Sequence, residues 1–359
     1  MKPSYKNIVV KIGTNALLSK NHTLHKRRLR EIANQLANLH GQGIHIVLVS
    51  SGAMGCGRAI VQPSSNRSPV EERQLLAAVG QVELMWAYRS AFRRRGITVA
   101  QVLATKDDFR SRKHYLNMKQ CFEILLKEHF IPIVNENDVV SVEELMFTDN
   151  DELAGLVTSM MRADALIMLT SVDGVMKDVN NGKKKEVIRL IQPEETTDGI
   201  EVKGKSSFGR GGMQTKLQIG KKLSSLGITT HIANAAAKHV LERILAGEEI
   251  GTKILPKNVK RSNTQRWLAS STVEQRGSIV VDEGAERAIT AVKPTNLLPI
   301  GIRSFSGTFE KGDVISVRNL RGNVIGMGKA AYDSGKLEKN IGKKDQSAFI
   351  RCAYFVPLS

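Results

Sequence analysis

The sequence predicts an α/β protein, in which a three-layer α/β/α sandwich around a mainly parallel sheet is followed by a small β-rich domain. Short runs rich in Val and Ile lack polar alternation, which is typical of strands buried on both faces of a sheet. Helical stretches alternate with these runs, as parallel strands require. After Gly251 the pattern changes to short strand-like segments at turn spacing, and a length of 359 residues favours two domains.

The first domain is expected to cover residues 1–258. Apolar runs that predict strands occur at 7–15, 44–57, 98–105, 130–138, 164–175 and 228–235. Helical stretches are expected at 26–41, 71–96, 113–129, 149–163, 216–227 and 237–247. In parallel α/β sheets, ligands bind beyond the carboxyl ends of the strands. The residues that follow each strand therefore form the candidate site.

A polar linker is expected at 259–274 and a small β-rich domain or barrel at 275–359. Strand-like segments occur at 277–284, 311–319 and 322–332. The pairs Glu283-Gly284 and Arg321-Gly322 predict turns between such segments.

The charge of the chain indicates which partners it attracts. The formal net charge is +18, and the basic excess is spread along the chain instead of forming a basic tail. Such a charge attracts anions in general, including nucleotides, acidic metabolites and RNA. The densest basic clusters, at 25–30, 93–95 and 183–185, are interpreted as solvated surface in preference to a nucleic-acid site.

Targeting and cysteine patterns favour the cytoplasm. The sequence has no apolar run of about eighteen residues, so no membrane span is expected. The apolar stretch near the N-terminus is too short for a signal peptide and is interpreted as a first strand. The cysteines are scattered without metal-ligand spacing, which favours reduced thiols.

Two lysines beside glycines are the strongest chemical signal. Lys11 lies inside an apolar strand just before Gly-Thr-Asn, and Lys216 ends the glycine-rich run 206–216. A lysine within such a strand is costly unless it meets an anion. Glycine-rich turns can surround anionic oxygens with backbone N–H groups. The combination fits phosphoryl transfer, in which positioning and charge neutralisation dominate.

The sequence offers no convincing general base, because no histidine accompanies a nucleophile motif. A hydroxyl acceptor would benefit from such a base. A carboxylate acceptor is already ionised at pH 7, since its reference pKa is about 4.3, and needs only alignment and screening. Taken singly, each glycine turn or acidic cluster also suits ordinary loops and helix caps; their joint occurrence favours a functional site.

Seven segments together resemble the amino acid kinase superfamily and, within it, the glutamate 5-kinases. In chain order they are VVKIGTNAL, VLVSSGAMGCG, QLLAAVGQ, PIVNENDVV, TDNDELAGLV, LTSVDGV and GRGGMQTK. The later segments SIVVDEGAERAI and LLPIGI resemble the PUA domain. The resemblance covers nearly the whole chain. It implies the amino acid kinase fold and ATP-dependent phosphorylation of the glutamate side-chain carboxylate to L-glutamyl 5-phosphate, the first step of proline biosynthesis.

The resemblance also implies roles for individual residues. Lys11 and Lys216 would stabilise the transferring phosphoryl group, and Asp151 would organise the two lysines. Glutamate would be bound by Ser51, Gly52, Asn135, Asp138, Asp149 and Asn150. ATP would be held by Lys11, Gly13, Thr170, Ser171, Arg210, Gly211, Gly212, Met213, Gln214, Thr215 and Lys216. Backbone N–H groups of Gly13 and Gly52 would lie near the phosphates.

Three positions depart from the usual pattern of the family. Ser171 stands where relatives often have aspartate, Met176 where they have tyrosine, and Arg210 where many have threonine. These changes concern the detail of the nucleotide pocket. Mg²⁺ would arrive with ATP and keep several waters, so no residue is assigned as a metal ligand. The resemblance further implies a homo-oligomer, a dimer or tetramer, and feedback inhibition by proline.

Two alternative functions stay open. One is another kinase of the superfamily, acting on N-acetylglutamate, aspartate, carbamate or a nucleoside monophosphate. Asp138 favours free glutamate, whose ammonium group needs an anionic or carbonyl partner. The other alternative is an RNA-binding protein with an inactive kinase domain. The C-terminal part is only modestly basic and poor in aromatic residues, which favours a structural or oligomer-tuning role over RNA binding.

Overall fold

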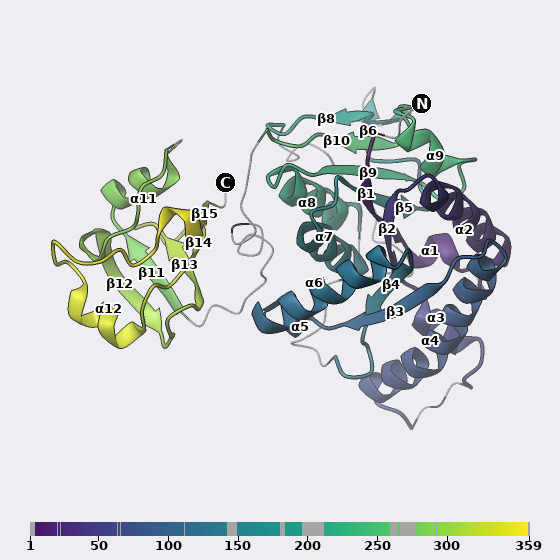
Figure 1. Cartoon of the computed structure of the whole chain (residues 1–359), viewed down its shortest axis with the longest axis horizontal. Helices are drawn as coiled ribbons and strands as arrows, with labels where there is room; N and C mark the ends of the chain where they lie inside the picture. The colour runs from purple at the N-terminus through teal and green to yellow at the C-terminus, as the bar shows by residue number, and fades with distance from the viewer. Residues whose placement is uncertain are drawn as a thin grey trace. The chain divides into compact units, whose positions relative to one another are not determined.

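The computed structural model describes residues 4–19, 21, 23–62, 64, 66–110, 112–141, 149–179, 184–195, 212–258, 265, 277–291 and 293–357. The chain divides into two compact units, Met1–Val259 and Lys260–Ser359 (Figure 1). Apart from Gln265, the expected linker at 259–274 lies outside the described residues. The expected domain limits therefore stay a prediction.

The first unit is built on a sheet whose described strands follow the order β3-β4-β2-β1-β5-β9-β10-β8. Pairs from β3 to β9 are parallel and β10 runs antiparallel to β9, which confirms the mainly parallel sheet. The bounds are β1 (Asn7–Ile12), β2 (His45–Ser50), β3 (Val99–Ala104), β4 (Ile131–Glu136), β5 (Ala165–Thr170), β8 (Leu190–Ile191), β9 (Thr229–Asn234) and β10 (Thr252–Ile254). A separate antiparallel ribbon pairs β6 (Met176–Val179) with β7 (Lys184–Val187).

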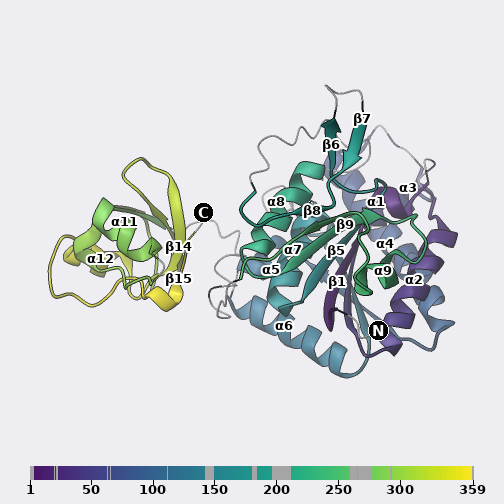
Figure 2. The same cartoon turned by 90° about the horizontal axis from the view of Figure 1, so that it is seen from above.

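Helices cover both faces of this sheet, which confirms the three-layer sandwich (Figures 1 and 2). One face carries α1 (Thr14–Leu17), α2 (Lys26–Gly41), α3 (Ala53–Arg58), α4 (Pro69–Arg93) and α9 (Val240–Leu245). The other carries α5 (Lys106–Arg110), α6 (Arg112–Lys127), α7 (Asn150–Met161) and α8 (Met213–Ser224). The sequence did not predict α1, α3 or α5; the end of the expected strand run 44–57 forms α3 instead.

The alternation of β1 decides which side chains reach each helical layer. Ile8, Val10 and Ile12 belong to the apolar core shared with α2, α4 and α9. Val9 and Lys11 point to the opposite face, where α7 packs on β1. The central strand therefore presents a lysine to the helices that carry the acidic residues.

Local sequence signals explain where two long helices begin. The side chain of Ser68 accepts from the N–H of Glu71, and the Glu71 side chain accepts from the N–H of Ser68, which forms a capping box at the start of α4. Asp149 caps α7 by accepting from the N–H groups of Asp151 and Glu152. These caps place the start of each helix within two residues of the expected position.

The second unit contains, in its described part, a sheet in the order β12-β11-β13-β14-β15. The elements are β11 (Gly277–Val281), α11 (Glu283–Thr290), β12 (Ile302–Gly307), β13 (Val314–Arg318), β14 (Val324–Lys329), α12 (Ser334–Asn340) and β15 (Phe355–Pro357). Phe309, Phe349 and Phe355 are buried in its core, as expected of a small β-rich domain.

One expected turn in the second unit is wrong. Glu283-Gly284 forms the first turn of α11, because Asp282 accepts from the N–H of Ala285 and caps that helix. The turn at Arg321-Gly322 is confirmed, with a φ of +81° at Gly322.

Among the described helices, none has the length and apolar character that crossing a membrane requires.

Candidate active site

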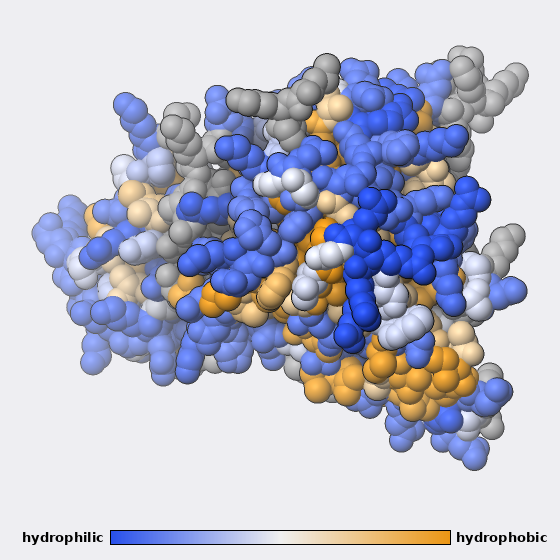
Figure 3. Space-filling model, turned by 45° about the vertical axis from the view of Figure 1, so that its right-hand side comes forward, coloured by the Kyte–Doolittle hydropathy of each residue, from blue (hydrophilic) through white to orange (hydrophobic). Residues whose placement is uncertain are grey.

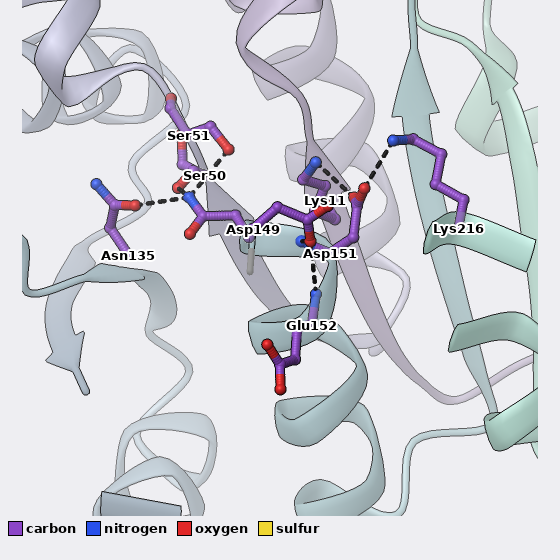
Figure 4. A network of polar contacts seen from close by, with 9 residues as sticks. Lys11, Ser50, Ser51, Asn135, Asp149, Asp151, Glu152 and Lys216 are labelled. Carbon is purple, nitrogen blue, oxygen red and sulfur yellow. Dashed lines mark hydrogen bonds and ion pairs between the residues drawn. The ribbon is translucent and has the colours of Figure 1, made fainter. Parts of the chain in front are cut away.

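Two lysines share one buried carboxylate at the carboxyl end of the sheet (Figure 4). Asp151 Oδ1 lies 2.5 Å from Lys11 Nζ, and Asp151 Oδ2 lies 2.6 Å from Lys216 Nζ. The Asp151 side chain is 0% exposed, and those of Lys11 and Lys216 are 7% and 12% exposed. The structure thus brings together the three residues expected to act on the phosphoryl group.

Each of the three comes from a different element. Lys11 is the penultimate residue of β1, Asp151 lies in the first turn of α7, and Lys216 lies in the first turn of α8. Figure 4 shows the lysines approaching the carboxylate from opposite sides. The carboxylate therefore holds two ammonium groups apart and keeps both near the strand end, where a ligand would bind.

The two aspartates at the start of α7 differ electrostatically. Burial by itself would raise the pKa of Asp151, but the charges of Lys11 and Lys216 outweigh it and lower that pKa below its ordinary value. For Asp149, burial and the neighbouring Asp151 charge raise the pKa. The site therefore keeps Asp151 ionised, and makes ionisation of Asp149 less favourable.

Asn150 organises the residues expected to bind the acceptor. Its Nδ2 lies 2.9 Å from the Ser50 carbonyl oxygen, 2.9 Å from Ser51 Oγ and 2.8 Å from Asn135 Oδ1, so its two N–H groups are shared among three acceptors. Ser51 and Asn135 lie at the ends of β2 and β4, whose carboxyl ends meet at this edge of the sheet. The structure thus brings these three predicted ligands together, with Asp149 beside them (Figure 4).

Only one of the two carboxylate oxygens of Asp149 caps helix α7. Oδ1 accepts from the N–H groups of Asp151 at 2.8 Å and Glu152 at 3.0 Å. Oδ2 is buried and has no hydrogen-bond partner in the part of the chain that the structure describes. A buried acceptor in this state is available to a donor from a ligand.

The two glycines expected near the phosphates behave differently. Gly52 has a φ of +107°, which favours glycine, and it precedes the first turn of α3. The N–H of Gly13 donates to the Leu169 carbonyl oxygen at 3.2 Å. This N–H is therefore engaged within the protein, contrary to the expectation that it faces a phosphate. A side chain at Gly13 would stand 3.6 Å from Lys11 Nζ.

Asp138 lies in the turn that follows β4, and α4 holds this turn in place. Arg73, which is buried, donates to the Ser141 carbonyl oxygen, and Gln74 Nε2 donates to the Val139 carbonyl oxygen at 2.7 Å. The position of Asp138 relative to the acceptor residues therefore depends on two side chains from a helix distant in sequence.

The residues expected to hold ATP follow β5 and begin α8. The Thr170 hydroxyl donates to the Val172 carbonyl oxygen and accepts from the Val172 N–H, while Ser171 is exposed. Gly212 caps α8, so Met213, Gln214 and Thr215 lie in its first turn, whose N–H groups lack intrahelical partners and suit an anion. Arg210 and Gly211 lie outside the described residues.

Several residues of the site were not identified from the sequence. Gln81 Oε1 accepts from Asn135 Nδ2 at 2.8 Å, and the Tyr88 hydroxyl lies 2.9 Å from Ser50 Oγ. Asn234 Nδ2 donates to Asp173 Oδ1 at 2.8 Å and joins the ends of β9 and β5. The segment QLLAAVGQ contained the signal for Gln81, but only contacts in space show what that residue touches.

Comparisons with known proteins show the family of the chain. The amino acid kinase family model matches residues 6–234, and the PUA domain model matches residues 277–348. Glutamate 5-kinase of Chlorobaculum tepidum is 45% identical, with 99% of each chain covered, and that of Bacteroides thetaiotaomicron is 40% identical over the same shares.

Two solved structures share the fold of the first unit at low identity. The carbamate kinase of Giardia lamblia gives a TM-score of 0.54 at 17% identity, covering 71% of this chain and 99% of that one. The UMP kinase of Bacillus anthracis gives 0.50 at 18% identity, covering 70% and 96%. The chain therefore belongs to the amino acid kinase family, in its glutamate 5-kinase group, and carries a C-terminal PUA domain.

Proposed function

We propose that this protein transfers the γ-phosphoryl group of ATP to the side-chain carboxylate of L-glutamate, giving ADP and L-glutamyl 5-phosphate, the first step of proline biosynthesis. The names of its full-length relatives support this substrate. The observation that carries the proposal is the buried Asp151 carboxylate with one lysine on each of its oxygens. A pair of oriented ammonium groups is what a phosphoryl group between two anions requires.

The transfer is direct and in line. A carboxylate oxygen of glutamate forms a bond to the γ-phosphorus while the bond from that phosphorus to the β–γ bridging oxygen breaks. Lys11 and Lys216 neutralise the charge that spreads over the phosphoryl oxygens, and Asp151 keeps both lysines aimed. No base is needed, because a carboxylate with a pKa of about 4.3 is already ionised at pH 7.

The acceptor pocket is assigned to Ser51, Gly52, Asn135, Asp138, Asp149 and Asn150. Asp138 and the unpartnered Asp149 Oδ2 supply negative charge or acceptors for the ammonium group. An acetylated amino group would carry no charge to meet them, which favours free glutamate over N-acetylglutamate.

The ATP-binding site is assigned to the ends of β5 and β9 and to the first turn of α8. The residues that would contact ATP there include Thr170, Ser171 and Gly212–Lys216. Mg²⁺ would screen the phosphate oxygens and would be held mainly by them, since this ion keeps several waters. Asp151 does not fit a metal-ligand role, because each of its oxygens already lies beside a lysine.

Three features beyond the reaction belong to the proposal. Proline resembles a cyclised glutamate and would compete with glutamate at the acceptor pocket.

A second copy of the chain would cover the exposed apolar side chains of α4, Val82 at 67% and Trp86 at 61%. Figure 3 shows apolar residues gathering low on one face, at the height of α4 in Figure 1. The PUA domain would have a structural or oligomer-tuning role.

The test is to incubate the purified protein with Mg–ATP, L-glutamate and hydroxylamine and to measure γ-glutamyl hydroxamate. N-acetylglutamate and aspartate are assayed in parallel. Hydroxamate from glutamate alone supports both the acyl-phosphate chemistry and the acceptor. Product from another amino acid would replace the acceptor, and no product from any of them would refute the proposed reaction.

A further inference from the structure

Three residues along one side of α4 form hydrogen bonds, at regular intervals, with residues in or beside the proposed acceptor pocket. Gln74, Gln81 and Tyr88 are seven residues apart, so they lie on one side of the helix about 10 Å from one another along its axis. They contact, in order, the Val139 carbonyl oxygen, Asn135 Nδ2 and Ser50 Oγ. The middle residue of the three is the one that contacts a predicted ligand of the acceptor directly.

Contacts with backbone groups define the orientation of the side-chain amides that are linked to Gln81 by hydrogen bonds. The Glu136 N–H donates to Asn135 Oδ1 at 2.9 Å, so this atom is an acceptor and Asn135 Nδ2 is the donor to Gln81 Oε1. The Ser50 carbonyl can only accept, so the Asn150 atom facing it is Nδ2. Gln81, Asn135 and Asn150 thus form one ordered series of donors and acceptors.

This ordering uses only one end of the Asn150 amide. All its side-chain hydrogen bonds come from Nδ2, and its Oδ1 has no hydrogen bond to any described residue. A carbonyl oxygen held in this way is an acceptor prepared for an ammonium group. At the other end of the series, Gln81 Nε2 is buried without a hydrogen-bond partner in the described part of the chain.

We propose that Gln81 is a positioning residue for the acceptor: by accepting from Asn135 it keeps the Asn150 carbonyl oxygen facing the ammonium group of the substrate. The inference rests on the proposed function, because it assigns the acceptor pocket its amino-acid end. Asn135 is only 3% exposed, so water does not readily replace a lost acceptor. Gln81 acts through Asn135 and leaves the phosphoryl-transfer centre unchanged.

Two substitutions separate the two ends of the Gln81 amide. Gln81→Met keeps the approximate size but removes the acceptor, so the KM for glutamate should rise about tenfold, the effect of one buried hydrogen bond. The kcat and the KM for ATP should stay within about twofold. Gln81→Glu keeps an oxygen for Asn135 Nδ2 and replaces the buried NH2 group, which has no acceptor among the described residues, by a second oxygen with a negative charge. Because the oxygen that Asn135 requires is kept, the KM for glutamate should return to within about threefold of the original.

The matched control is Gln120→Met on α6, the same substitution at an exposed helical position, which should change none of these constants. Thermal unfolding is measured for each variant, and Gln81→Leu replaces Gln81→Met if the latter does not fold. The inference would be overturned by an unchanged KM for glutamate in Gln81→Met, or in Gln81→Leu where that variant replaces it. It would also be overturned if the KM for glutamate rose as much in Gln81→Glu as in the variant without the acceptor. Absence of hydroxamate from the original protein would instead refute the proposed function.

Discussion

Asp151→Asn perturbs the centre of the site with the smallest change of shape. The carboxylate lies within 2.6 Å of both lysine nitrogens, and an amide offers one uncharged acceptor in its place. At most one lysine can then keep its partner. Removing one member of a buried ion pair typically costs about 3–5 kcal/mol. Because the lysine side chains are 7% and 12% exposed and reach water by small movements, we expect a loss near the lower end, about 3 kcal/mol, in the free energy of unfolding at pH 7.

The loss should depend on pH in a defined direction. The folded-state pKa of Asp151 is lowered, although burial alone would raise it. A carboxyl group of this kind contributes stability above its unfolded pKa, about 3.9, and that contribution is lost as the pH falls through the folded pKa. Denaturant unfolding should therefore show the largest difference between Asp151→Asn and the original protein near pH 7, and a smaller one below about pH 4.

The effect on catalysis is expected to be similar in free energy to the effect on stability. A lysine without its carboxylate no longer has a fixed direction, and the loss of one preorganised electrostatic contact lowers kcat by about 10²–10³. The control is Leu36→Ala, which removes a fully buried side chain of α2 and should cost about 2–5 kcal/mol without changing kcat per folded molecule. A kcat for Asp151→Asn within about threefold of the original, measured by hydroxamate formation, would refute the reasoning.

Three further predictions concern the two lysines, the packing of α4 against α3 and the Asp149 carboxyl group. Lys11→Ala and Lys216→Ala should each lower hydroxamate formation at least about 100-fold while circular dichroism stays native, and near-normal turnover in either would contradict the assigned role. Gly80→Ala should lower the free energy of unfolding by about 1–3 kcal/mol, because the added methyl group overlaps a backbone carbonyl oxygen of α3. The control Gly41→Ala adds a methyl group in open space and should not destabilise the protein. Equal melting temperatures of the two variants would disprove this expectation. Asp149→Asn keeps a capping side chain but removes a carboxyl group whose pKa is raised by burial. That carboxyl group stabilises the fold below its unfolded pKa, and the stabilisation is lost as the pH rises through the folded pKa. In urea unfolding, the variant should therefore lose less stability than the original protein as the pH rises above about 4, and identical pH profiles would refute this expectation.

Local patterns were sufficient to predict most elements of the first unit. The apolar run around β1 acts over a few residues, so its consequence can be read directly from the sequence. The Ser68–Glu71 capping box is equally local, but it was not identified from the sequence, and the start of α4 was expected two residues too late. The turn expected at Glu283-Gly284 was wrong for a related reason. The pair suits either a turn or a helix start, and the cap from Asp282 decided for the helix.

By itself, the sequence determined the alternation of the main strands and helices of the first unit, and it singled out Lys11, Asp151 and Lys216, because periodicity and residue type are local properties. Only the tertiary structure decided that one carboxylate lies between the two lysines, that Leu169 engages the Gly13 N–H, and that Gln81 accepts from Asn135. Hydrogen bonds and ion pairs depend on distance in space, and the residues that form these lie 54–156 positions apart in the chain. Residue types can suggest a chemistry, but contacts across the fold decide which atoms perform it.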